Sequence, residues 1–196
     1  MLALGRRRRL QAVSLSLPAL LTIMIGDLIF AAETTAWHQI DAADSRLDLS
    51  ETGLAPYKFL SAQNQEGTND YVAFPEGHVR LDIAREKGWF NGDEEALRRA
   101  LKLHAQASKV AIDVDNLDIH HSSADLGPLI YAVYPSGEWT CVGFSINAGL
   151  KVPLIGGSGT DSILSGEFCK KGPQPKIADE ELPHIRKIHL QQQPGF

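Results

Sequence analysis

The chain has 196 residues and a formal net charge of −5, with 19 Lys and Arg against 24 Asp and Glu. Four of the basic residues cluster at Arg6 to Arg9, so that residues 33–196 carry only 15 basic against 23 acidic side chains. Nonspecific nucleic-acid binding needs clustered positive charge, and so does peripheral attachment to anionic lipid. The composition therefore excludes nucleic acid as an expected partner, and it excludes a lipid surface for the bulk of the chain.

Residues 1–32 predict a signal peptide or signal anchor. The arginine cluster precedes an apolar run from Leu10 to Phe30, and small residues follow that run. A basic stem, an apolar stretch and a small-residue cleavage site are the parts of a secretory signal. We therefore expect the rest of the chain to be exported, most simply to a periplasm.

Cleavage and anchoring are alternative fates of this segment. Release after Ala36 places Thr34 where a small side chain is preferred, whereas release after Ala32 places the bulky Phe30 there. Residues 10–30 also match the roughly 20 residues that span a bilayer, although Asp27 interrupts them. Without cleavage, this segment would anchor the domain at the inner membrane and be its only membrane contact.

Cys141 and Cys169 are the two cysteines of the chain. In an exported protein an even pair indicates a disulfide, whereas two free buried thiols would suit a cytosolic chain. The pair lacks C-x-x-C spacing, which favours a structural bond over thiol redox catalysis. The predictions of export and of a disulfide therefore support each other.

The elements expected in residues 33–172 indicate one α+β domain. The clearest is a helix over residues 93–107, because apolar residues recur at helical spacing and acidic residues crowd its first turn. Alternation of apolar and polar residues predicts strands, which cover residues 71–74, 78–84, 109–115, 129–134, 139–146 and 162–169. We expect one main helix packed on an antiparallel sheet of four to six strands, an order that resembles cystatin-like and NTF2-like arrangements.

Residues 135–138 predict the turn of a β-hairpin, because Pro and Gly stand at turn positions. Pairing of Tyr134 with Trp139 would gather the apolar residues of both strands on one face and leave Cys141 on the other. An antiparallel neighbour with Cys169 opposite Cys141 keeps the alternation of both strands consistent. The apolar–polar alternation of residues 139–146 and that of residues 162–169 are thus both consistent with a disulfide between Cys141 and Cys169.

Residues 149–161 are the long connection that this register leaves before the last strand. Long loops beside a rigid element often carry function, and this one contains apolar residues in a segment expected to be exposed. The same residues would equally suit a loop that folds back to complete the core. The candidate binding residues on the loop and the nearby sheet are Trp139, Leu150, Val152, Leu154 and Ile155.

The densest group of possible metal ligands lies between residues 113 and 125. Carboxylates and imidazoles at short spacing suit divalent cations. The spacing fails as a calcium loop, because Leu117 takes the fifth place and no Gly follows. A solvated strand face and a polar turn explain the same residues. The metal candidates are Asp113, Asp115, Asp118, His120 and His121, and no cofactor is expected.

Other catalytic patterns are incomplete, so no catalytic residue is predicted. A glycine–serine run at residues 156–161 has Thr160 where a nucleophile elbow needs its final Gly. His104 lies on the apolar side of the expected helix, which favours a packed, hydrogen-bonded histidine over a general base.

Two functions remain open. The first is a non-catalytic envelope protein that binds an unknown protein or small molecule through the sheet face and residues 149–161. The alternative is a small exported enzyme, a metal-assisted hydrolase centred on the segment from Asp113 to Asp125. The first is favoured because no nucleophile–base pair and no metal-ligand spacing stands out. Residues 173–196 are rich in Pro and Gln and are expected to form a loosely ordered C-terminal tail.

Overall fold

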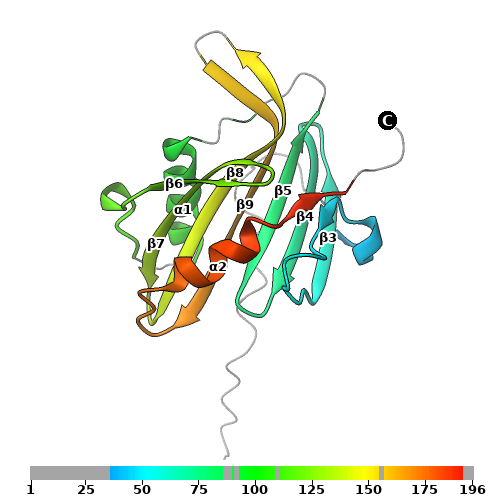
Figure 1. Cartoon of the computed structure of the whole chain (residues 1–196). Helices are drawn as coiled ribbons and strands as arrows, with labels where there is room; N and C mark the ends of the chain where they lie inside the picture. The colour runs from blue at the N-terminus through cyan, green and yellow to red at the C-terminus, as the bar shows by residue number, and fades with distance from the viewer. Residues whose placement is uncertain (1–35, 86–89, 91–92, 109–110, 155–156, 192–196) are drawn as a thin grey trace, which may run out of the picture.

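The computed structural model describes residues 36–85, 90, 93–108, 111–154 and 157–191 (Figure 1). The expected signal segment, residues 1–32, lies outside the described residues. Inside these ranges, none of the helices combines the length and the apolarity of a membrane span.

The centre of the fold is an eight-stranded antiparallel sheet with the order β1-β3-β4-β5-β9-β8-β7-β6 (Figure 1). A second, two-stranded sheet pairs β2 with β10. The strands of the large sheet are β1 (His38–Gln39), β3 (Lys58–Gln63), β4 (Gly67–Phe74), β5 (Gly77–Ala84), β6 (His120–Ala124), β7 (Gly127–Ser136), β8 (Trp139–Leu154) and β9 (Gly157–Lys171). Those of the small sheet are β2 (Leu47–Asp48) and β10 (His189–Leu190).

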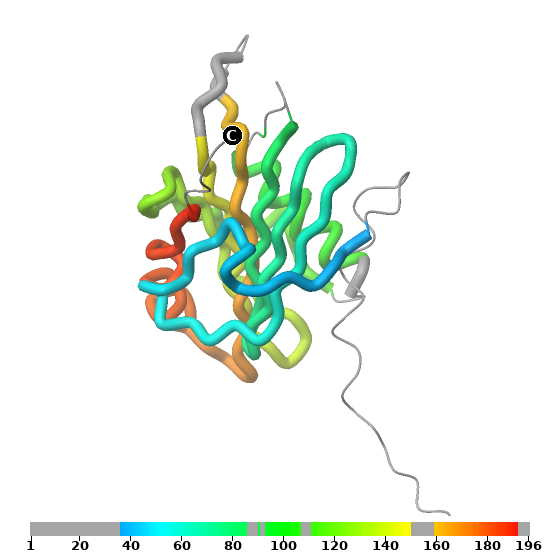
Figure 2. Tube along the Cα trace, turned by 90° about the vertical axis from the view of Figure 1, so that its right-hand side faces the viewer, coloured from blue at the N-terminus to red at the C-terminus, as the bar shows by residue number. Residues whose placement is uncertain are grey.

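Two α-helices lie on opposite faces of the large sheet. Helix α1 (Glu94–Ser108) connects β5, in the middle of the sheet, to the region of β6 at its edge. Helix α2 (Ile177–Ile185) follows β9 and leads to β10, and Figure 2 shows this orange-to-red segment beside the sheet. Short 3-10 turns are formed by Ala42–Asp44 and Val114–Asn116.

The main apolar core lies between the sheet and α2, on the side called here the α2 face. Alternate residues of five central strands point there, and the chain of α2, β2 and β10 covers them. The buried members from the sheet are Val72, Phe74, Val79, Leu81, Leu129, Val142, Phe144, Ile146, Leu164 and Phe168, and those of the covering segments are Leu47, Ile177, Leu182, Ile185 and Ile188.

A buried ion pair fastens the β2 segment to this side of the sheet. Asp70 on β4 is 1% exposed and accepts hydrogen bonds from the backbone and guanidinium of Arg46 at 2.7 and 2.9 Å. Ser61 donates to the same carboxylate at 2.8 Å. The carboxylate thus receives the several partners that a buried charge needs.

The α+β class expected from the sequence is wrong, because the described residues form ten strands and only two α-helices. The missed strands lack a clean alternation: β6 reads His-His-Ser-Ser-Ala, and β3 has apolar residues on both faces. The strand expected over residues 109–115 is also wrong for its described part, where residues 114–116 form a 3-10 turn.

The hairpin of β7 and β8 forms two residues away from the expected register. Ser136 pairs with Trp139, and Tyr134 pairs with Cys141. Gly137 occupies the tight turn with a φ of 63°, a conformation that glycine adopts freely. Because side chains alternate with a period of two, this shift leaves every side chain on its expected face.

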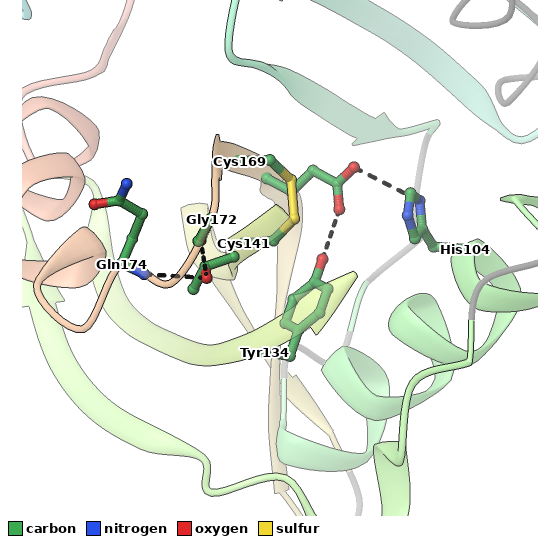
Figure 3. The surroundings of a disulfide bond; sticks show 8 residues. His104, Tyr134, Cys141, Cys169, Gly172 and Gln174 are labelled. Atoms are coloured by element: carbon green, nitrogen blue, oxygen red, sulfur yellow. Dashed lines mark hydrogen bonds and ion pairs between the residues drawn. A yellow bond between two sulfur atoms is a disulfide. The ribbon is translucent and has the colours of Figure 1, made fainter. Parts of the chain in front are cut away.

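The disulfide between Cys141 and Cys169 is confirmed. The two residues are direct cross-strand partners on β8 and β9, and their sulfur atoms are bonded. The bond lies on the face of the sheet that α1 covers, beside Tyr134 (Figure 3).

Residues 149–161 continue the sheet instead of forming a loop. Strand β8 extends to Leu154, and β9 begins at Gly157. The register shifts between Ala148 and Lys151, where Gly149 has a φ of 75°. This irregularity interrupts the alternation, which is why the sequence resembled a loop.

Residues 173–191 are packed against the domain, in contrast to the loose tail expected there. Ile177, Ile185 and Ile188 are fully buried in the main core, and β10 pairs with β2. Three buried aliphatic side chains on one short segment explain why it docks despite its Pro and Gln content.

Candidate functional site

The second face of the sheet, called here the α1 face, is apolar on one half and polar on the other. Helix α1 packs over β7 and β8, where Leu97 and Leu101 belong to one buried apolar cluster with Ile130, Ala132 and Tyr134. On the central strands the residues that point to the same side are mostly polar. This polar face consists of Asn69, Tyr71, His78, Arg80, Asp82, Ser145, Asn147, Ser165 and Glu167.

The strand register sets these residues in rows across four strands. Arg80 on β5 pairs with Ser165 on β9, which pairs with Ser145 on β8. In the next row His78 pairs with Glu167, which lies opposite Gly143. Direct cross-strand partners are about 5 Å apart, so the polar groups form one continuous surface.

Glu167 stands at the junction of the two halves of the α1 face. The Tyr134 hydroxyl donates to its Oε2 at 2.6 Å, and the Nδ1 of His104 lies 3.7 Å from its Oε1 (Figure 3). The helix and the sheet therefore point side chains at one carboxylate. The side chains of Glu167 and His104 are 15% and 17% exposed.

Gly143 makes room for the ring of Tyr134. A Cβ at this position would lie 2.9 Å from Leu101 Cδ2 and 3.1 Å from Tyr134 Cε1. Contacts that short force neighbouring atoms to move, so a side chain at residue 143 would displace the ring that reaches Glu167. The disulfide lies next to this contact, because Tyr134 pairs directly with Cys141.

Arg80 is already held by groups of its own surface. Its Nε donates to Asp82 at 2.8 Å, and its Nη2 lies 2.7 Å from the same carboxylate and 3.2 Å from Asn69 Oδ1. The guanidinium carbon also lies 5.8 Å from the ring centre of Trp37. The positive charge of Arg80 is therefore compensated within the fold by Asp82.

Aromatic rings lie along the outer part of the polar face. Tyr71 stacks on His78 with ring centroids 5.2 Å apart, and Trp37 meets Tyr71 edge to face at 6.2 Å. Such rings offer flat apolar surface beside the polar groups.

Two polar atoms of β8 are buried without a partner among the described residues: the hydroxyl of Ser145 and the side-chain oxygen of Asn147. Ser145 is 4% exposed. Burial of a polar group without a hydrogen bond costs about 1–3 kcal/mol. The fold therefore leaves hydrogen-bonding capacity unused on the polar face.

Burial sets the protonation states around Glu167. It lowers the pKa of His78, against the opposing attraction of Glu167, so that the imidazole is neutral near neutral pH. It raises the pKa of Tyr134 well above its ordinary value, an effect that the neighbouring Glu167 strengthens. Tyr134 is therefore a permanent hydrogen-bond donor. Burial also raises the pKa of Tyr71 to about 12 and that of Asp82, where Arg80 opposes it.

The five metal candidates take part in separate surface contacts. His120 and His121 are successive residues of β6 and so point to opposite faces. His121 Nε2 lies 2.7 Å from Glu94, and His120 Nε2 lies 3.5 Å from Asp118. Within the ranges that the structure describes, no three His, Cys, Asp or Glu side chains are placed to hold a metal ion.

The remaining two metal candidates belong to the segment that Arg98 organises. The Arg98 guanidinium donates to the backbone carbonyls of Val114, Asp115 and Leu117. Asp113 accepts a hydrogen bond from Asn116 at 2.9 Å. These contacts give the acidic segment a structural part in joining α1 to β6.

The expected binding residues lie away from the polar face or outside the described side chains. Trp139 begins β8 at the hairpin turn and is 45% exposed. Leu150, Val152 and Leu154 belong to the extension of β8, and Ile155 lies outside the described residues.

The residues that build the polar face were not singled out from the sequence. Their signal is faint: His78, Arg80 and Asp82 alternate with apolar residues on β5, which is the pattern of any strand with a wet face. Only the pairing of β5 with β9 brings them to Glu167.

No protein-family model matches the sequence, and a comparison with curated proteins finds no match. The function is therefore argued from the geometry of the polar face.

Proposed function

We propose that this domain is an exported, non-catalytic binding protein that receives a small molecule on the polar face. The observation that carries the proposal is the buried, unpartnered pair of Ser145 hydroxyl and Asn147 oxygen on β8. Native folds pair nearly all buried polar atoms. Two such atoms on one strand face leave hydrogen bonds that a ligand can complete once it displaces the side chains that cover them.

The chemistry of the polar face favours binding over catalysis. A nucleophilic serine needs a base hydrogen-bonded to its hydroxyl, and Ser145 has no such partner among the described residues. Tyr134 is held as a phenol and donates to Glu167. The surface thus offers fixed donors and acceptors, which orient a ligand.

Export is the second part of the proposal. Its support is the basic and apolar segment of residues 1–32 together with the disulfide, because disulfides persist in oxidising compartments. Expression of the full sequence in a bacterium, followed by fractionation and mass determination of the released chain, tests this part. A start at Trp37 would agree with cleavage after Ala36, whereas reduced full-length protein in the cytosol would contradict export.

A protein-detected NMR screen of small polar and aromatic compounds tests the binding part. We expect ligands to shift resonances of residues on β5, β8 and β9 that belong to the polar face. Ser145→Val, which fills the place of the hydroxyl with methyl groups, should abolish these shifts, and the matched change Ser123→Val at an exposed site of β6 should not. Ligand shifts that map elsewhere, or that survive in Ser145→Val, would contradict the proposal.

A further inference from the structure

Glu167 is the least compensated charge of the polar face. Its side chain is 15% exposed, and within the described part of the chain no Lys or Arg pairs with it. His104 Nδ1 is 3.7 Å away, beyond hydrogen-bond distance, and an imidazole is charged only when protonated. Arg80 does not help, because it pairs with Asp82 at 2.7 Å. A carboxylate removed from water without a cation is costly, so this surface favours an added positive charge.

The unsatisfied groups of the same surface are mainly acceptors. A carboxylate offers about four lone-pair sites, and the one hydrogen bond to Glu167 among the described residues comes from Tyr134. Asn147 adds an unpartnered oxygen, and the Ser145 hydroxyl accepts as well as donates. Glu167 is partly accessible, whereas the Ser145 and Asn147 oxygens are covered, so a molecule that reaches all three must displace neighbouring side chains and be rich in donors.

We propose that the polar face binds a small organic cation with N–H donors, of which a primary ammonium ion is the simplest. This inference rests on the proposed function, because it names what occupies the same surface. An ammonium group supplies both the missing charge and three donors, whereas a neutral polyol supplies donors alone. The stacked rings of Tyr71 and His78, beside Glu167, offer an apolar surface to the carbon part of such a ligand.

Neutrality of the neighbouring histidine agrees with a cationic ligand. Burial lowers the pKa of His78, which pairs across the strands with Glu167. Its imidazole therefore does not repel a cation near neutral pH. Asp82 lies four residues after His78 on β5 and pairs with Arg80. The two opposite charges cancel, so that this end of the surface has a net charge near zero.

Four probes with one carbon skeleton separate charge from hydrogen bonding: benzylammonium, benzyltrimethylammonium, benzyl alcohol and benzoate. They are titrated into the oxidised protein at about pH 8, where an ordinary histidine is neutral and an amine is still charged. We expect benzylammonium to bind the polar face roughly tenfold or more tightly than the other three.

Each other result of this titration has a distinct meaning. Tighter binding of benzoate or benzyl alcohol on the polar face would overturn the cation inference and leave the proposed function standing. Equal binding of benzyltrimethylammonium would overturn the need for N–H donors. If none of the four probes shifts a resonance of the polar face, the inference is contradicted, whereas the proposed binding function is decided by the wider NMR screen.

Glu167→Gln tests the residue that the inference depends on. The amide oxygen still accepts the hydrogen bond from Tyr134, but the charge is lost, and benzylammonium should bind about tenfold more weakly. The matched control is Glu138→Gln, which removes an equal charge from an exposed carboxylate paired with Lys171. Unchanged affinity in a folded Glu167→Gln protein would overturn the proposal. If that variant does not fold, Ser145→Ala serves instead, and unchanged benzylammonium affinity there has the same meaning.

Discussion

Replacement of Ser145 by alanine should stabilise the protein in the absence of ligand. The hydroxyl is 4% exposed and has no partner among the described residues, so the folded state bears a penalty of about 1–3 kcal/mol. Removing one oxygen leaves a void that costs about 0.3 kcal/mol. The net gain is about 0.7–2.7 kcal/mol, which corresponds to a rise in Tm of roughly 1–11 °C for a domain of this size.

Thr140 on the same strand supplies the matched comparison. Its hydroxyl donates to the Gly172 carbonyl at 2.7 Å and accepts from the Gln174 backbone N–H at 3.2 Å (Figure 3). Thr140→Val keeps the shape and loses both bonds, which should lower the free energy of unfolding by about 1–2 kcal/mol.

Urea unfolding of both variants decides the matter. Opposite signs for the two hydroxyls support the account of β8, because the same chemical group is then costly at residue 145 and stabilising at residue 140. If Ser145→Ala destabilises the protein as Thr140→Val does, the Ser145 hydroxyl has a partner in the folded chain. The argument for the polar face would then fail.

Three other predictions concern the surroundings of Glu167. Replacing Cys141 and Cys169 by serine opens a loop with a sequence separation of 28 residues. This should lower the free energy of unfolding by about 3.5 kcal/mol in the chain-entropy model. Urea midpoints that coincide for variant and parent would contradict this. Because burial lowers the folded-state pKa of His78, the unfolded chain takes up the proton more readily, and stability is lost as the pH falls through the ordinary histidine value of about 6.5. His78→Gln should therefore have a smaller loss of stability between about pH 7 and 5 than the parent, and an unchanged or steeper loss would refute the assignment. Gly143→Ala should displace the Tyr134 ring, because the new Cβ would lie 3.1 Å from it, and should lower the free energy of unfolding by about 1–3 kcal/mol. If the near-ultraviolet circular dichroism of tyrosine and the stability are both unchanged, the ring does not need this space.

Local patterns in the sequence were enough to find several elements. The alternation of Val79, Leu81 and Ile83 located β5, and helical spacing located α1 to within a residue at each end. The faces of the β7–β8 hairpin were also predicted correctly although the register was not, because a shift of two residues preserves sidedness. The disulfide was predicted from an even cysteine pair in a chain expected to be exported, and the same sidedness agreed with it.

Long-range pairing was beyond the reach of these patterns. Nothing local to β5 indicates that its neighbour is β9, and so His78 and Glu167 could not be brought together from the sequence. The alternation on β5 predicted a strand with one apolar side, but it could not show what the opposite side faces, where His78, Arg80 and Asp82 are half-buried. Strand β6, with no large apolar residue, depends on its partner β7 rather than on its own pattern.

The docked end of the chain was missed for a similar reason. Pro183 and the flanking polar residues of α2 are typical of loose termini, but the helix keeps Ile177, Leu182 and Ile185 on its inner side. Burial of these aliphatic side chains outweighs the weak helix propensity.

The strand order has a consequence for how the protein assembles. Strands β3, β4 and β5 form one meander of neighbours in sequence, and β6 to β9 form another. The two are joined at β5 and β9, where residues as distant in the chain as Leu81 and Leu164 pair. Contacts between such distant residues form slowly, because a long loop must close first. We expect the two meanders to form early and to dock late. Since both cysteines belong to the second meander, oxidation can precede docking, and the polar face comes into existence only at that last step.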